Sequence, residues 1–331
     1  MDSPFNTTFK PSWWLNNCHL QTIYPTLFMK RYPVPLREER FELSDGDYID
    51  GVWTDKSSGP IVILLHGLQG SANSHYINSL MHTIHHETNW QALALNLRGC
   101  GQDKQRSFRQ YHSGDTEDIR FILHLIKQRF PTQPIAMVGY SLGGNLLLKL
   151  LGELKQNRLC QTAVAISPPF DLASTAQNIQ KGLGKVYQKI FLDDIKSSLI
   201  KKYPHHYNTE KLQKKLHDLQ TLEDLDHQFT APMHGYDSIY EYYQDCSSIG
   251  YLNSIKVPTL VMIAKDDPIV NYNYLPKPES ISNNVTLEIH EKGGHVGFIS
   301  GGILNHHLWM NQRIMSHLAH YLPLCIHEET E

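Results

Sequence analysis

One stretch of the chain, residues 135–150, restricts its possible folds more than any other. An apolar run is followed by Gly139-Tyr140-Ser141-Leu142-Gly143 and then by a leucine-rich run typical of a helix. This order predicts a strand, a sharp turn with Ser141 at its apex, and a helix. Glycines flank the serine because the two backbones come too close there for a Cβ atom. The turn would expose the hydroxyl group and leave the first N–H groups of the helix without partners.

A serine hydroxyl group is a weak nucleophile, so this interpretation requires a general base and an acidic residue elsewhere in the chain. Both follow later strands. The apolar run at residues 259–264 leads into Asp266 and Asp267, and the run at residues 285–289 leads into a glycine-rich loop that carries His295. The order of serine, acid and histidine along the chain is the one that such a turn requires. Both aspartates are candidates for the acid at this point.

An earlier strand supplies a candidate for binding an oxyanion. Residues 61–65 are apolar at every position, as in a central parallel strand, and they end in His66-Gly67-Leu68-Gln69-Gly70. The glycines permit a backbone turn that directs the N–H group of Leu68 towards the site. For His66, a role in holding this loop by hydrogen bonds is favoured over a catalytic role.

The rest of the pattern predicts an α/β protein. Strand-like and helix-like segments alternate, which is typical of a mostly parallel sheet, here of about eight strands. The helix expected at residues 115–130 should be capped by Ser113 or Asp115. Residues 39–54 are expected to form a hairpin with an Asp-Gly turn. Residues 1–35 have no strong helix or strand pattern, and we expect an extended arm that packs aromatic side chains on the body.

The alternation of strands and helices stops at about residue 171. From there to about residue 250, helical pieces rich in basic and aromatic residues follow one another without a strong strand. We interpret residues 171–250 as a helical cap inserted over the carboxyl ends of the strands, where ligands bind in open α/β sheets. Residues 1–170 and 251–331 would then form the α/β core. The lysines of the cap are expected to face solvent, with a peripheral contact to a membrane surface as the alternative.

Composition argues against several other classes of protein. The 331 residues carry a net charge of −3 with mixed signs, so no nucleic-acid partner is expected. Five scattered cysteines favour a reducing compartment. We expect a cytoplasmic protein without a membrane span, because the sequence shows no signal peptide and no apolar run of about 18 residues. The 20 histidines include no His-Glu-x-x-His sequence, so no metal and no cofactor are expected.

Short motifs occur along nearly the whole chain, at residues 11–14 with 19–22, 45–47, 66–70, 96–100, 111–114, 139–145, 265–268 and 293–298. Together they resemble the YheT-like branch of the α/β-hydrolase superfamily. The resemblance implies an α/β-hydrolase fold and a serine hydrolase that acts on carboxylic esters without a cofactor. Eukaryotic members of this branch carry a membrane anchor and act on lipid acyl chains.

The resemblance also implies a role for each candidate residue. Ser141 would attack the ester carbonyl group, His295 would accept its proton and return it to the leaving alcohol, and an aspartate would orient the imidazole ring. Asp267 is preferred to Asp266, since loops of this superfamily usually read Asp-x-hydrophobic-hydrophobic and the sequence after Asp267 fits that register. The oxyanion would be bound by two backbone N–H groups, those of Leu68 and Leu142.

The expected protein is therefore a carboxylesterase that cleaves small-molecule esters of short- to medium-chain acids through an acyl-enzyme intermediate. A lipase acting on acylglycerols or phospholipids, a thioesterase and an aminopeptidase are alternatives, because the fold and the triad serve all of these reactions. A binding protein that retained the fold without activity is a further alternative. No feature of the sequence predicts an oligomeric state.

Overall fold

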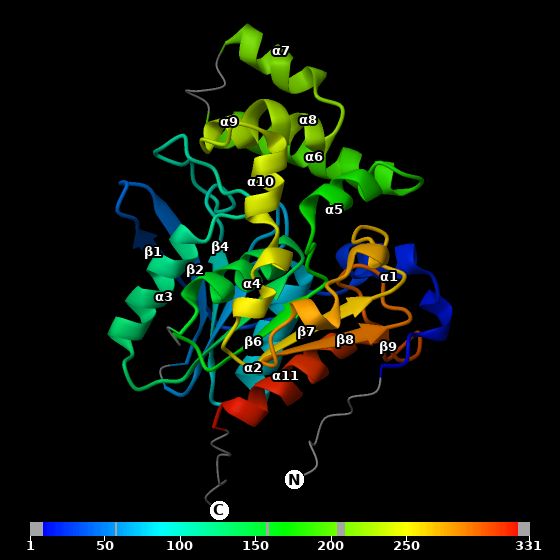
Figure 1. Cartoon of the computed structure of the whole chain (residues 1–331). Helices are drawn as coiled ribbons and strands as arrows, with labels where there is room; N and C mark the ends of the chain where they lie inside the picture. The colour runs from blue at the N-terminus through cyan, green and yellow to red at the C-terminus, as the bar shows by residue number, and fades with distance from the viewer. Residues whose placement is uncertain (1–8, 57, 157–158, 204–208, 324–331) are drawn as a thin grey trace, which may run out of the picture.

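The computed structural model describes residues 9–56, 58–156, 159–203 and 209–323. Figure 1 shows a central sheet flanked by helices, with a further group of helices above it. Eight strands form the sheet, in the order β1-β2-β4-β3-β5-β6-β7-β8. Their bounds are β1 Leu36–Glu42, β2 Tyr48–Thr54, β3 Ile61–Leu65, β4 Gln91–Asn96, β5 Ile135–Tyr140, β6 Thr162–Ile166, β7 Thr259–Ala264 and β8 Val285–His290.

The sheet is mostly parallel, as the sequence predicts. Each neighbouring pair from β4 to β8 is parallel, whereas β2 is antiparallel to both β1 and β4. Strands β1 and β2 form the expected hairpin, and Gly46 in its turn has a φ angle of +81°. Because the parallel strands end at one edge of the sheet, the loops that follow them gather there. A separate two-stranded ladder joins β9 (Ile299–Ser300) to β10 (His307–Leu308).

Helices cover both faces of the sheet. The apolar sides of α3 (Glu117–Arg129) and α4 (Leu142–Leu154) pack on one face. Those of α2 (His75–Glu87) and α11 (Trp309–Tyr321) pack on the other. The side chains of β3 alternate between these two cores because successive residues of a strand point to opposite faces. The uniformly apolar sequence of β3 therefore reflects burial on both sides.

A group of helices connects β6 to β7, and Figure 1 shows it at the top of the molecule. Part of this group has its own apolar cluster, which includes Leu192, Leu216 and Phe229. Such a cluster allows the helices to pack on one another above the sheet. Their bounds are α5 Leu172–Ile179, α6 Gly184–Lys202, α7 Glu210–Asp218, α8 Leu222–Leu225, α9 Ala231–Met233 and α10 Ile239–Cys246.

The N-terminal segment differs from the expected extended arm. A 3-10 helix spans Trp13–Leu15, and the helix α1 spans Cys18–Phe28. The side chain of Asn17 caps α1 by accepting hydrogen bonds from two backbone N–H groups of its first turn, at 2.9 and 3.3 Å. The expectation of an arm without helix is therefore wrong for this segment, and residues 1–8 lie outside the described residues.

The predicted cap of α3 is also wrong. Thr116 occupies the N-cap position and makes no side-chain capping bond. Asp115 instead pairs with Arg109 at 2.7 Å, and the carbonyl oxygen of Ser113 accepts a hydrogen bond from the side chain of Asn145 at 2.8 Å. The carboxylate of Asp115 is thus used in an ion pair instead of a cap.

Candidate active site

Ser141 lies at the sharp turn between β5 and α4. Its backbone has a φ of +51° and a ψ of −120°, a region that residues with a side chain rarely occupy. Its N–H group donates a hydrogen bond of 2.8 Å to the carbonyl oxygen of Ile166, which ties the turn to the end of β6. The strained turn holds the serine hydroxyl group at the carboxyl edge of the sheet, as the sequence predicts.

Two glycines make this turn possible. A Cβ atom on Gly139 would lie 2.4 Å from the carbonyl oxygen of Gly143. A Cβ atom on Gly143 would lie 2.4 Å from the carbonyl oxygen of His66. Both distances are far inside van der Waals contact with backbone atoms, which cannot move aside as a flexible side chain can. Glycine is therefore required at both positions by close packing of strand β5, helix α4 and the loop after β3.

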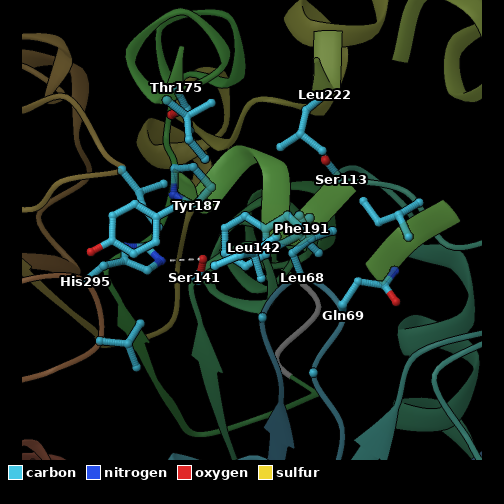
Figure 2. A pocket seen from close by; sticks show the side chains of 18 of the residues that line it. Leu68, Gln69, Ser113, Ser141, Leu142, Thr175, Tyr187, Phe191, Leu222 and His295 are labelled. Carbon is cyan, nitrogen blue, oxygen red and sulfur yellow. Dashed lines mark hydrogen bonds between the residues drawn. The ribbon is translucent and has the colours of Figure 1, made fainter. Parts of the chain in front are cut away.

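His295 reaches Ser141 from the loop after β8. Its Nε2 atom lies 2.8 Å from the Oγ atom of Ser141, the contact drawn as a dashed line in Figure 2. The loop approaches α1 closely, because a Cβ atom on Gly294 would lie 2.5 Å from the carbonyl oxygen of Cys18. Gly294 has a φ of +61°. The glycines before His295 thus allow the loop to fit against α1 and to turn the imidazole ring towards the serine.

The other ring nitrogen of His295 contacts Asp267. The distance from Nδ1 to Oδ2 is 2.8 Å, and both side chains are buried. An ionised carboxylate only accepts hydrogen bonds, so Nδ1 carries the proton that is donated to it. In the neutral ring this leaves Nε2 free to accept the hydrogen of the Ser141 hydroxyl group. The geometry therefore suits transfer of the serine proton to His295.

The two candidate aspartates occupy different positions. Oδ1 of Asp267 accepts the backbone N–H groups of Ile269 and Val270, at 2.8 and 2.9 Å, which leaves Oδ2 for the imidazole ring. Asp266 does not face that ring. Its Oδ1 atom accepts the N–H group of Gly294 at 3.0 Å, and burial raises the pKa of its carboxyl group. The structure thus brings Asp267, and not Asp266, to the imidazole of His295.

The predicted oxyanion donors lie on two facing turns. In the loop after β3, the N–H groups of Gly67 and Gln69 donate to tyrosine hydroxyl oxygens, each at 3.0 Å. The N–H group of Leu68 lies between them, and Leu142 begins α4. Within the described ranges, neither of these two N–H groups has a hydrogen-bond acceptor in the protein. Leu68 and Leu142 line the same cavity as Ser141, and Figure 2 labels all three residues there. An N–H group without a protein acceptor at such a place can donate to a substrate oxygen.

His66 fixes this loop by hydrogen bonds, which is the role that the sequence analysis favoured for it. Its Nε2 atom accepts the backbone N–H group of Leu97 at 3.0 Å, and its Nδ1 atom donates to the carbonyl oxygen of Gly67 at 2.7 Å. Complete burial lowers the pKa of His66 to about 4, so the ring is neutral at physiological pH. These bonds fix the turn that presents the N–H group of Leu68.

A cavity of about 720 Å³ opens over Ser141 and His295. Most of its lining is apolar, and much of that comes from the helices between β6 and β7, including Leu172, Tyr187 and Phe191. Figure 2 shows Tyr187 close to the imidazole ring of His295. A cavity of this kind suits a substrate with an apolar chain, because apolar surface is removed from water on binding.

Helix α1 contributes to the site in a way that the sequence analysis missed. The Oγ1 atom of Thr22 accepts the backbone N–H group of His295 at 2.9 Å. The side chain of Gln21 bonds the backbone of Ile299, just beyond the same loop. The signal was present, because both residues belong to a motif, residues 19–22, on which the family resemblance rested. The amino-acid composition of this motif did not indicate what it does.

The fold and this arrangement of side chains define a class of protein. The chain belongs to the α/β-hydrolase family, whose model, described as alpha/beta hydrolase fold, matches residues 60–302. Within it, the chain is 36% identical to the Escherichia coli protein named "Putative esterase YheT", over 95% of this chain and 94% of that protein. This similarity agrees with the YheT-like branch identified from the sequence motifs.

More distant relatives carry the names of lipid hydrolases. The monoacylglycerol lipase of Saccharomyces cerevisiae is 31% identical over 72% of this chain and 55% of that protein. The mouse phospholipase ABHD3 is 27% identical over 89% of this chain and 74% of that protein. Relatives named as an esterase and as lipases agree with the class expected from the sequence, a carboxylic ester hydrolase.

Solved structures show the same fold. An esterase from Pyrococcus furiosus, Pf2001, superposes with a TM-score of 0.59 and 19% identity, over 89% of this chain and 96% of that one.

No helix in the described part of the chain combines the length and apolar character needed to cross a membrane. In the same residues, His, Cys, Asp and Glu side chains form no group of three or more that could hold a metal ion.

Proposed function

We propose that this protein is a serine esterase in which Ser141, His295 and Asp267 form the catalytic triad. The observation that carries the proposal is the continuous chain of contacts from Ser141 Oγ to His295 to Asp267, each 2.8 Å long. Ser141 attacks the ester carbonyl carbon while His295 removes its proton. The N–H groups of Leu68 and Leu142 stabilise the oxyanion, a contribution of roughly 3 kcal/mol per donor in related sites.

The reaction then proceeds through an acyl-enzyme. Protonated His295 gives its proton to the leaving alcohol, and Asp267 stabilises the imidazolium ion without accepting its proton. A water molecule next attacks the acyl group on Ser141, with His295 as the base. The second step releases the acid and restores the serine hydroxyl group. No cofactor takes part in this sequence.

We further propose that residues 171–250 act as a cap that shapes the acyl site, with residues 1–170 and 251–331 as the core. The apolar lining that Leu172, Tyr187 and Phe191 give to the cavity supports this division. The substrates proposed are small esters of short- to medium-chain acids. Five scattered cysteines support action in a reducing compartment, for which we propose the cytoplasm.

Purified protein assayed with acyl esters of increasing chain length tests this proposal. We expect hydrolysis of short and medium chains, and a loss in kcat on the order of 10⁶ for Ser141→Ala. Circular dichroism of that variant controls for folding. Matched thioesters and aminoacyl amides test the neighbouring reactions, and a preference for either over the oxygen ester would replace the esterase proposal. Activity that survives Ser141→Ala would remove Ser141 as the nucleophile.

A further inference from the structure

Two helices expose apolar side chains to solvent in the same pattern. On α1, which also exposes Phe28 at its end, one set consists of Leu20, Ile23 and Leu27. The second set consists of Leu183, the N-cap residue of α6, with Val186 and Ile190 in that helix. Both sets follow the spacing i, i+3, i+7, which places each set on one face of its helix. Leu27 is 65% exposed and Leu183 is 58% exposed. Single exposed apolar residues are ordinary, but grouped ones mark an interaction surface.

The two stripes meet at the mouth of the active-site cavity. The Nδ1 atom of His19 on α1 lies 3.0 Å from the hydroxyl oxygen of Tyr187 on α6, and the two rings stack. Five of the six exposed residues, all except Leu20, also line the cavity above Ser141. Figure 1 shows α1 and α6 on the same side of the molecule. The exposed apolar surface is therefore continuous with the lining of the substrate site.

Cations outnumber acidic residues in the sequence segments that carry these stripes. Residues 9–36 contain three cationic side chains and no aspartate or glutamate, although the whole chain has a net charge of −3. Residues 172–192 likewise contain three lysines and no acidic residue. One of these lysines, Lys189, pairs with Asp193 at the next turn of α6. The six cations are Lys10, Lys30, Arg31, Lys181, Lys185 and Lys189.

We propose that this face of α1 and α6, with its cations, binds an anionic lipid surface and holds the mouth of the cavity against it. Apolar side chains flanked by lysine and arginine are the combination that partitions into the interface of such a membrane. A second copy of the chain fits less well. In a two-fold dimer the same patch would meet itself, and cations would face cations. The charge pattern therefore favours lipid over self-association.

This surface goes beyond the proposed function, since binding needs none of the catalytic groups. When the protein is bound in this orientation, an apolar substrate could enter the cavity directly from the lipid phase. Helix α1 also holds the loop of His295 through Thr22. The helix that contacts the lipid surface thus lies directly behind the candidate base.

Flotation with lipid vesicles tests the proposal, with Ser141→Ala used alongside the unmodified protein. We expect binding to vesicles of phosphatidylcholine mixed with phosphatidylglycerol, roughly tenfold weaker binding to phosphatidylcholine alone, and weakening by salt. Leu27→Glu and Val186→Glu should each lower the partition coefficient by roughly tenfold. Tyr240→Glu is the matched control, because Tyr240 is 79% exposed on α10 and lies outside the cavity lining. Ser141→Ala should bind as the unmodified protein does.

The proposal is overturned if the unmodified protein does not float with the anionic vesicles, or if Tyr240→Glu weakens binding as much as the two patch variants. A shift from dimer to monomer in Leu27→Glu, with vesicle binding unchanged, would assign the surface to a second copy instead. Failure of the esterase proposal is a separate outcome. A protein that binds the vesicles but has no esterase activity would refute the catalytic assignment and would still support the proposed lipid-binding surface.

Discussion

The backbone N–H group of His295 donates a hydrogen bond of 2.9 Å to the side-chain oxygen of Thr22. The two residues are joined although one lies in the N-terminal helix and the other in the last loop of the sheet. Thr22 is itself fixed, because its hydroxyl group donates to the carbonyl oxygen of Cys18 at 2.7 Å. Helix α1 is therefore part of the support of the proposed base.

Replacing Thr22 should consequently affect catalysis more than folding. In Thr22→Val the His295 N–H group loses its acceptor, an interaction worth about 1 kcal/mol, and we expect kcat to fall by about three- to tenfold with little change in KM. Steady-state kinetics on one ester, with the unfolding temperature measured in parallel, provides the test. Thr22→Ser retains the oxygen and should stay near full activity. Equal rates for Thr22→Val and the unmodified protein would contradict this role.

The two aspartates after β7 should respond differently to the same change. In Asp267→Asn the amide cannot hold the imidazole ring in the required tautomer, and we expect kcat to fall by about 10⁴-fold. In Asp266→Asn the amide oxygen can still accept the N–H group of Gly294, so the loss should be within about tenfold. Parallel kinetics of both variants tests the assignment. A greater loss for Asp266→Asn would make Asp266 the acid.

A buried ionic cluster should contribute strongly to stability. The fully buried side chain of Arg98 donates to Asp118 at 2.8 and 2.9 Å and also pairs with Asp45 and Asp47. In Arg98→Met these carboxylates lose their cation, and we expect the free energy of unfolding to fall by roughly 3–5 kcal/mol. Urea unfolding measures this loss. Arg106→Met is the control, because its exposed pair with Glu42 should add little stability.

Acidification should destabilise the protein through its buried histidines. Burial lowers the pKa of His66 to about 4, below the ordinary value of 6.5, so only the unfolded chain takes up a proton between these values. The contribution of His66 to the free energy of unfolding is fully present above pH 6.5 and is lost as the pH falls towards 4. Among the described residues, burial lowers the pKa of four more histidines to about 3 or 4, namely His75, His112, His234 and His317.

Carboxyl groups whose pKa is raised by burial act in the opposite direction, and two of them reach a pKa of about 7. Burial raises the pKa of Asp115 and Asp226 to about 7, so the folded protein gains stability from each as the pH falls through that range. Five histidines outweigh two carboxyl groups, and we expect the unfolding temperature to be lower at about pH 5 than at about pH 7.5. The variant His66→Asn should show a smaller difference between these conditions. An unfolding temperature that rises on acidification would mean that the carboxyl groups dominate, contrary to this expectation.

Much of the site could be predicted because its residues follow strand ends. Parallel strands end at one edge of a sheet, so Ser141 after β5, Asp267 after β7 and His295 after β8 converge without any knowledge of packing. The loop role of His66 was predicted for a similar reason, since it directly follows β3. Ser141, His295 and Asp267 contact one another in sequence because the strand order places β5, β6, β7 and β8 side by side.

Other features depend on contacts that local sequence does not encode. Helix α1 contains Pro25, which weakens its helical pattern. In the folded chain it is supported by hydrogen bonds between the side chains of Gln21 and Thr22 and the backbone in and just beyond the loop of His295. Asp115 resembles a helix cap in sequence, but Arg109 binds it in the folded chain. Such tertiary partners override local preference, which explains both wrong predictions.

Labelling with a fluorophosphonate, followed by mass spectrometry of the modified peptide, asks whether Ser141 is the activated nucleophile. Such a reagent reacts with a serine whose hydroxyl group is activated by a neighbouring base. We expect a single adduct on Ser141, no adduct in Ser141→Ala, and much slower labelling in His295→Ala. An adduct on another serine, or labelling that persists in Ser141→Ala, would contradict the proposed triad.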